Sequence, residues 1–224
     1  MTRLTKFSVA TLLGVILLAG GIQATTETTF FTSYLPRLLF NDNFAPVVEG
    51  KFYRSAEMNR QDLSAALSKN SIRTVIDLRA GLDDPDSDGF TEEKTATSLG
   101  VDYVHIPMFA SRYPSRETML KLLETFQQAK QPLLVHCSSG THRSGVVSAI
   151  WLLEVGGGTA EQARQQLSAY FGFFPLERRF KSWMQGHPTL DDMLFRYLDA
   201  TKRESISFRD WVMRELPSEN APAT

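Results

Sequence analysis

The chain has 224 residues, of which 42% are hydrophobic and 22% charged, the composition of a globular protein with a substantial core. Its 24 Lys+Arg and 25 Asp+Glu residues give a formal net charge of -1, so the charge balance does not favour a nucleic-acid or polyanion carrier. A single cysteine excludes an intramolecular disulfide and the Cys/His spacings of structural zinc sites. We therefore expect one catalytic domain with appendages, and no metal or cofactor.

The first residues are typical of a targeting segment. Arg3 and Lys6 precede an apolar run at 7–22, and the small residue Ala24 follows it. This pattern predicts either a secretory signal peptide over 1–24 or a retained membrane anchor, with membrane association through 4–22. Because the basic residues keep the N-terminus inside, both alternatives predict a periplasmic or exported domain, or one anchored in the inner membrane and facing outward, if the source is bacterial.

Three further segments follow the targeting segment. Residues 25–49 are expected to form a connector, in which Pro36 and Pro46 discourage regular structure. The domain proper is expected over 50–216, including the C-terminal helices, and 217–224 is expected to be a disordered tail.

Strands and helices are predicted to alternate along the domain. Strands are expected at 51–55, 72–78, 101–106 and 133–135. Helices are expected at 60–68, 92–99, 116–129, 144–155, 159–170, 190–202 and 208–216. Asn59, Ser115 and Thr159 are predicted to cap three of these helices. The order predicts an α/β fold, a central mostly parallel sheet flanked by helices with extra C-terminal helices, and a ligand site at the carboxyl ends of the strands.

The most informative segment is 135–145, VHCSSGTHRSG, between an apolar strand and an apolar helix. A loop of small residues at such a junction can bring several backbone N–H groups together into an anion site at the positive end of a helix. A sulfur at the start of the loop shares that field, which favours the thiolate form of Cys137. We therefore expect Cys137 to be a nucleophile.

The other residues of this segment have expected roles in binding an oxyanion. The guanidinium of Arg143 can bind two phosphoryl oxygens with parallel hydrogen bonds, which a lysine cannot copy. Ser144 is expected to hydrogen-bond the sulfur, and His136 to orient the loop from behind. The expected phosphate-binding residues are Ser138, Ser139, Gly140, Thr141, His142 and Arg143. For His142, the backbone is expected to contribute more to phosphate binding than the ring does to catalysis.

The pattern of His136 and Cys137, five residues, then Arg143 and Ser144 resembles the signature loop of the protein tyrosine phosphatase superfamily. Segments 52–56 and 74–79 resemble those of compact bacterial dual-specificity-like phosphatases, and plant and fungal atypical dual-specificity phosphatases are similar as well. The resemblance covers about 50–172. It implies a cysteine phosphatase-like fold and hydrolysis of phosphate monoesters through a phosphocysteine intermediate.

One part of the family pattern is absent from its expected place. Such phosphatases usually carry an Asp, on the loop before the signature strand, that protonates the leaving oxygen, and general acid catalysis is worth about 10² to 10⁴ in rate. Here that loop, 109–115, reads FASRYPS and contains no carboxylate. Arg112 within it is a candidate contact for substrate phosphate. The remaining candidates for the acid are Asp83, Asp84, Asp86, Asp88 and Glu117.

The expected activity is that of a protein tyrosine or dual-specificity phosphatase. The alternatives are an inositol phosphate or pyrophosphate phosphatase, and a pseudophosphatase that binds phosphate without turnover. The expected partners are a phosphorylated protein or a small phosphate ester, and not a nucleic acid.

Overall fold

The computed structural model describes residues 35, 41–81, 91–174 and 186–219, and the expected targeting segment at 1–24 lies outside them. The strands are β1 (Ala45–Val48), β2 (Phe52–Ser55), β3 (Thr74–Asp77), β4 (Asp102–His105) and β5 (Leu133–His136). The helices are α4 (Arg60–Lys69), α5 (Glu92–Ser98), α6 (Arg116–Gln128), α7 (His142–Glu154), α8 (Ala160–Gln165), α10 (Leu190–Ala200) and α11 (Phe208–Glu215). A 3-10 turn, η2, spans Ala169–Phe171.

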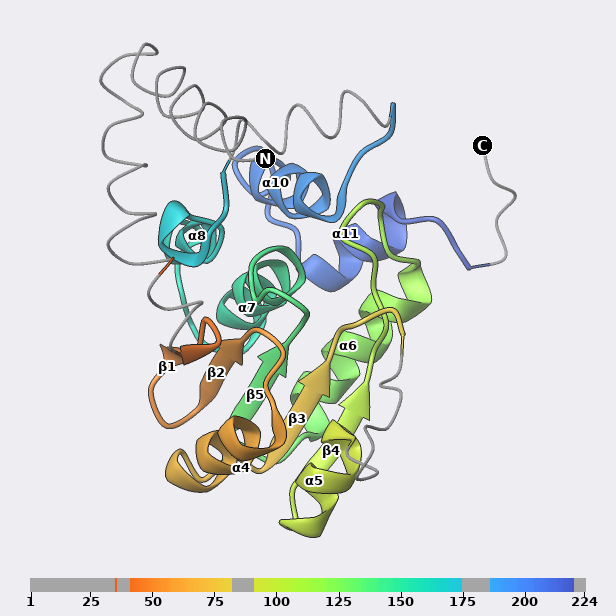
Figure 1. Ribbon diagram of the computed structural model, residues 1–224. Helices are drawn as coiled ribbons and strands as arrows, with labels where there is room; N and C mark the ends of the chain where they lie inside the picture. The colour runs from red at the N-terminus through yellow and green to blue at the C-terminus, as the bar shows by residue number, and fades with distance from the viewer. Residues whose placement is uncertain (1–34, 36–40, 82–90, 175–185, 220–224) are drawn as a thin grey trace, which may run out of the picture.

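The five strands form one sheet in the order β1-β2-β5-β3-β4, with β5 at its centre (Figure 1). Strand β5 runs parallel to β2 and β3, and β4 runs parallel to β3. Only β1 is antiparallel to its neighbour among these strands. The carboxyl ends of β2, β5, β3 and β4 therefore meet at one edge of the sheet, as the sequence predicts for the ligand site. The mostly parallel α/β architecture is confirmed.

Alternate residues of the strands belong to two different hydrophobic clusters, one on each face of the sheet. Leu134 in β5 faces a smaller cluster with Leu63 and Leu67 of α4. Leu133 and Val135, its neighbours in the strand, face a larger cluster built mainly with α6, α7, α10 and α11. Both faces of β5 are thus covered, which explains why this strand is a continuous apolar run.

The N-terminal edge of the sheet differs from the sequence expectation. Strand β1 lies inside 25–49, which we expected to be a connector without regular structure. Pro46 is tolerated there because β1 is an edge strand, paired only with β2, and the register shifts between Pro46 and Val48.

The C-terminal end differs in a similar way. The carbonyl of Pro217 accepts a hydrogen bond from the Arg116 amide at 2.9 Å, and the Glu219 amide donates to the Glu117 carboxylate at 2.8 Å. Residues 217–219, expected to begin a disordered tail, therefore pack against the first turn of α6. Residues 220–224 lie outside the described part.

The predicted helix caps are confirmed. The side chains of Asn59 and Ser115 accept the amides of Asp62 and Thr118, and Thr159 forms a capping box with Gln162. The helix expected at 159–170 is shorter, because Ser168 adopts an extended conformation (φ -131°, ψ 165°) and begins η2. Among the described residues, no helix combines the length and the apolar character needed to cross a membrane.

Candidate active site

The predicted signature loop lies at the ligand-binding edge of the sheet. Strand β5 ends at His136, Cys137 follows directly, and α7 begins at His142. The side chain of Cys137 is buried, with 1% of its surface exposed, and belongs to the larger hydrophobic cluster. The loop at 137–141 thus joins the central strand to the N-terminus of a 13-residue helix, the setting that favours anion binding.

A fully buried arginine holds the loop from the β2 side. The guanidinium of Arg54 donates to the carbonyls of Gly140 at 2.6 Å and Thr141 at 3.1 Å, and to the backbone carbonyl of Gln166 at 2.6 Å. Its central carbon lies 3.9 Å from the centroid of the Phe171 ring. Neutral carbonyls and an aromatic face therefore satisfy a buried charge that would otherwise be costly.

Asn43 supports the same loop from the segment before β1. Its amide nitrogen donates to the carbonyl of Ser139 at 3.1 Å and to that of Phe171 at 3.3 Å. Asn43 has a φ of +51°, a left-handed conformation in which asparagine is enriched. Asn43 and Arg54 together bind three consecutive carbonyls of the loop.

These contacts orient the amide groups of the loop. In a trans peptide the N–H points opposite to the C=O of the same peptide unit. Because the carbonyls of Ser139, Gly140 and Thr141 face Asn43 and Arg54, the next three amides along the chain point away from these two side chains. The result is a row of donors at the N-terminus of α7, the arrangement that binds tetrahedral oxyanions.

Gly140 is required by this geometry. Its φ is +68°, and a Cβ atom at this position would lie 2.6 Å from the Ala56 nitrogen and 2.8 Å from the Ser55 carbonyl oxygen. Both are backbone atoms that cannot move without displacing the end of β2. The glycine lets the loop approach β2 closely enough for Arg54 to reach it.

Arg143 lies on the other side of the loop, over β3 and β4. Its Nη1 donates to the carbonyls of Leu78 at 3.3 Å and Met108 at 3.4 Å, and its Nη2 donates to the Ser138 hydroxyl at 3.1 Å. Leu78 directly follows β3 and Met108 follows β4 by three residues. The two guanidiniums thus contact the loop from opposite sides, Arg54 inside the protein and Arg143 at the partly exposed rim.

Two hydroxyls of the segment donate to backbone carbonyls of neighbouring segments. The buried Ser144 hydroxyl, which we expected to bond the Cys137 sulfur, donates to the Ser55 carbonyl at 3.3 Å. The Thr141 hydroxyl donates to the Phe171 carbonyl at 3.0 Å. The Thr141 side chain is therefore already bonded inside the protein, and the phosphate-binding role expected for Thr141 would fall to its backbone amide.

A buried ionic network lies behind His136. Arg79 donates to the Asp77 carboxylate at 2.8 Å and to that of Glu92 at 2.6 Å, and the Tyr103 hydroxyl donates to Asp77 at 2.7 Å. The Nε2 atom of His136 lies 3.1 Å from the Glu92 carboxylate. This network fixes the residue that precedes Cys137, consistent with the orienting role expected for His136.

The network also controls the ionisation of its carboxylate. Burial alone raises the pKa of Asp77, but the Arg79 hydrogen bonds, His136 and Tyr103 outweigh burial and hold the pKa below its ordinary value. Burial, together with the negative charge of Asp77, raises the pKa of the Tyr103 hydroxyl.

The same network contains a candidate set of metal ligands. The ligand atoms of Asp77, Glu92 and His136 lie within 4.8 Å of one another. The guanidinium of Arg79 already donates to both carboxylates, so a divalent cation would have to displace a bound positive group. The arrangement is that of an ion-pair network.

His142 contacts a residue of the C-terminal helices. Its Nδ1 atom lies 2.8 Å from the carboxylate of Asp191 in the first turn of α10, and its ring packs edge-on against Phe173 with 5.4 Å between centroids. The His142 side chain is 26% exposed, whereas that of Asp191 is 2% exposed. The ring of His142 thus has a fixed partner in α10. The phosphate-binding role expected for its backbone stays a prediction.

The loop at 109–115 also meets α10. The Leu190 amide donates to the Ala110 carbonyl at 3.1 Å, which places the start of α10 beside this loop. Arg112, the candidate phosphate contact, stacks on the Phe109 ring with its guanidinium carbon 4.1 Å from the centroid. Phe109 itself is 47% exposed.

The candidates for the general acid are only partly described. Asp83, Asp84, Asp86 and Asp88 lie in 82–90, outside the described residues. Glu117 is described, and its own amide and the Glu219 amide hold the pKa of its carboxyl below the ordinary value. Since a general acid must keep its proton near neutral pH, Glu117 does not fit that role.

Three residues of the site, Arg54, Asn43 and Asp191, were not predicted from the sequence. The sequence signal for Arg54 was a charged residue inside a predicted strand. The structure shows that all four residues of this strand are buried. Asn43 and Asp191 carry no such signal, since they are far from the loop along the chain and reach it only through the fold.

Comparison with known proteins identifies the family of the chain. A model of the family described as "DSP-PTPase phosphatase fused to NAD+ Kinase" matches residues 40–180. The chain therefore belongs to this family of dual-specificity and tyrosine phosphatases, and the expected superfamily is confirmed. The match begins before β1 and extends beyond η2.

Among individual proteins, the chain is similar to the tyrosine-protein phosphatase cdc-14 of Caenorhabditis elegans, with 30% identity over 92 residues. The match covers 41% of this chain and 12% of that protein, so the chain spans about an eighth of its curated relative. A solved structure of a mutant form of Tk-PTP has 19% identity and a TM-score of 0.50, and the match covers 72% of this chain and 97% of that one.

A second solved structure is the core catalytic domain of the PP-IP phosphatase SIW14 from S. cerevisiae, in complex with citrate. Its identity is 20% and its TM-score 0.49, and the match covers 74% of this chain and 96% of that one. The comparison with Tk-PTP supports the cysteine phosphatase-like fold expected from the sequence.

Proposed function

We propose that this phosphatase hydrolyses phosphate monoesters through a phosphocysteine intermediate on Cys137. The observation that carries the proposal is the anchoring of three consecutive loop carbonyls by Asn43 and Arg54, which turns the following amides toward one side. A row of amides at a helix N-terminus, next to a cysteine and an arginine, binds a phosphoryl group and stabilises the charge that develops during its transfer.

The proposed reaction has two steps. The sulfur of Cys137 attacks phosphorus and the bond to the leaving oxygen breaks, which produces phosphocysteine and an alcohol. Water then attacks phosphorus, the P–S bond breaks, and inorganic phosphate leaves. In both steps Arg143 binds two equatorial oxygens, so its guanidinium must leave the carbonyls of Leu78 and Met108 when substrate binds.

Ser144 has a proposed role in the second step. Rotation of its hydroxyl from the Ser55 carbonyl to the Cys137 sulfur would stabilise the departing thiolate. The phosphate-binding amides are proposed to come from 138–143, as the sequence indicates.

The proposed substrates are proteins phosphorylated on tyrosine, serine or threonine. Inositol phosphates or pyrophosphates are the alternative class, and a pseudophosphatase that binds without turnover is the alternative to catalysis. A panel of phosphopeptides, inositol polyphosphates and p-nitrophenyl phosphate, assayed with wild type and Cys137→Ser, separates these cases.

Release of inorganic phosphate by wild type and its loss in Cys137→Ser supports the proposed chemistry. Radiolabel that stays covalently bound to rapidly denatured wild type from a ³²P substrate, and that is absent from Cys137→Ser, identifies the intermediate. Binding of phosphate without release by either protein would establish the pseudophosphatase instead.

We also propose that the domain acts outside the cytoplasm, in the periplasm or anchored to the inner membrane. The support is the basic and apolar pattern of 1–24 alone. Fractionation of cells that express the chain with and without these residues tests the proposal, and equal recovery of both forms in the cytoplasm would contradict it.

A further inference from the structure

We propose that His142, oriented by Asp191, is the general acid and base of the reaction. This inference rests on the proposed phosphocysteine mechanism, which needs a proton donor for the leaving oxygen. The loop at 109–115 supplies no carboxylate, and the Glu117 carboxylate already accepts the Glu219 amide at 2.8 Å. Asp83, Asp84, Asp86 and Asp88 lie outside the described residues, so His142 is the candidate that the described part of the loop offers. His142 directly precedes Arg143 in the sequence, so its backbone is part of the proposed phosphate-binding loop.

The geometry of the pair assigns a role to each ring nitrogen. Nδ1 lies 2.8 Å from the Asp191 carboxylate, so it carries a hydrogen that the carboxylate accepts. Nε2 is then the nitrogen that can exchange a proton with substrate, and the partial exposure of the ring keeps it accessible. A buried carboxylate fixes the tautomer and the orientation of the histidine in the same way in Ser-His-Asp triads.

The surroundings of Asp191 support this assignment. Its side chain is 2% exposed, and its Oδ1 atom has no hydrogen-bond partner among the described residues. Carboxylates are rarely buried unless they are paired, so the contact with His142 is the interaction that offsets the burial of Asp191. The position of Asp191 in the first turn of α10 adds the favourable field of a helix N-terminus.

The proton balance follows from these assignments. In the first step the imidazolium donates its Nε2 proton to the oxygen whose bond to phosphorus breaks. In the second step the neutral ring accepts a proton from the water that attacks phosphocysteine, which restores the imidazolium. Histidine suits both steps because the same ring nitrogen can donate a proton and then accept one.

Asp191 is a positioning residue in this scheme and does not contact substrate. It belongs to the C-terminal helices, whose first residue Leu190 is also bonded to the 109–115 loop. These helices therefore contribute to the site as well as to the hydrophobic core, because they supply the group that orients the histidine.

The test compares two aryl phosphates of similar shape and different leaving-group basicity. p-Nitrophenolate is a stable anion that leaves without a proton, whereas phenolate needs one. We expect Asp191→Asn and His142→Gln to lower kcat on phenyl phosphate by about 10² or more, and kcat on p-nitrophenyl phosphate by less than about tenfold. Inhibition by inorganic vanadate should stay within about threefold of wild type, because the phosphoryl site is unchanged.

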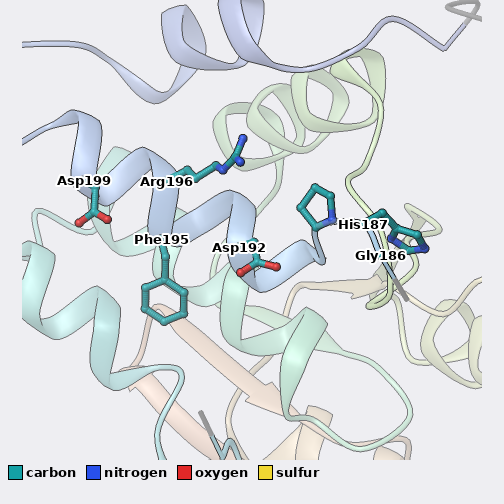
Figure 2. A pocket seen from close by; sticks show the side chains of 7 residues that line it. Gly186, His187, Asp192, Phe195, Arg196 and Asp199 are labelled. Carbon is teal, nitrogen blue, oxygen red and sulfur yellow. The ribbon is translucent and has the colours of Figure 1, made fainter. Parts of the chain in front are cut away.

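The control variant is Asp199→Asn on the same helix. Asp199 is exposed on α10, where it lines a surface pocket with Asp192, Phe195 and Arg196 (Figure 2). It pairs at the surface with Lys202, so its replacement should leave both substrates unaffected.

The outcomes separate the inference from the proposed function. Equal loss on both substrates, or loss of vanadate inhibition, would show a structural role for the pair and overturn the inference while the phosphatase chemistry stands. Failure of the wild type to hydrolyse either ester would overturn the proposed function and, with it, the inference. His142→Gln keeps the test decisive if Asp191→Asn does not fold, because the histidine is partly exposed.

Discussion

The guanidinium of Arg54 donates to the carbonyl of Gly140 at 2.6 Å, from inside the protein and from the neighbouring strand β2. This bond joins a buried charge to the backbone of the candidate phosphate loop. It links the stability of the fold to the geometry of the site, because the same side chain also binds Gln166 after α8.

Replacement of Arg54 should therefore lower both stability and activity. Arg54→Met leaves the carbonyls of Gly140, Thr141 and Gln166 without their donor, which should cost about 2–4 kcal/mol of the free energy of unfolding. Arg54→Lys keeps the charge but loses the planar guanidinium that donates to several carbonyls at once. It should be more stable than Arg54→Met and still lose most of kcat. Urea unfolding measures the stability and kcat/KM the activity. Wild-type activity in Arg54→Lys would contradict the proposed role of the guanidinium.

Gly140→Ala should abolish activity because its Cβ would meet the backbone of Ser55 and Ala56. Gly157→Ala is the matched control: its φ of +66° is nearly that of Gly140 at +68°, but no atom beyond the adjacent residues lies within 4 Å of the added Cβ. The control should lose only the cost of the left-handed conformation, about 1–2 kcal/mol, and keep its activity. Similar behaviour of the two variants in thermal unfolding and turnover assays would refute the close-approach explanation.

Arg143→Lys should lose most of its kcat, because a point charge cannot bind two phosphoryl oxygens in parallel. The expected loss is about 10² or more, from the removal of transition-state stabilisation. Arg214→Lys provides the comparison, since Arg214 is exposed on α11 and pairs with Glu204. Turnover of p-nitrophenyl phosphate is measured for both variants. Near-normal turnover in Arg143→Lys would contradict the proposal that Arg143 binds two phosphoryl oxygens.

The ionic network behind His136 should make stability depend on pH in the acid range. Because the folded state holds the pKa of Asp77 below its ordinary value of 3.8, the carboxylate contributes stability that is fully present above that value. This stability is lost as the pH falls through the lower, folded-state pKa. Asp77→Asn should accordingly destabilise the protein at neutral pH, with a difference from wild type that shrinks in acid.

Urea unfolding of wild type and Asp77→Asn from pH 7 to about pH 3 measures this difference. Asp102→Asn is a suitable comparison, because Asp102 is exposed and pairs only at the surface with Lys130. A difference between wild type and Asp77→Asn that stays constant over the whole range would show that the charge of Asp77 is not the cause.

Much of the fold could be predicted because its signals are local. Caps such as Ser115 act on amides three residues away, and the apolar run of β5 reflects burial on both sides. The predictions for the two ends of the domain were wrong, because contacts between residues far apart in the sequence determine the structure there. Pro46 discourages a strand in isolation but is tolerated at a sheet edge, and Pro217 is fixed by the start of α6.

The sequence by itself determined the family of the protein, because the spacing of Cys137 and Arg143 and the small residues between them are properties of one short segment. Only the tertiary structure decided what surrounds that segment. Asn43, Arg54 and Asp191 come from distant parts of the chain, and burial places them against the loop through contacts that no local periodicity records. Backbone carbonyls and ring nitrogens accept partners from any part of the chain, so their partners become known only when the packing is known.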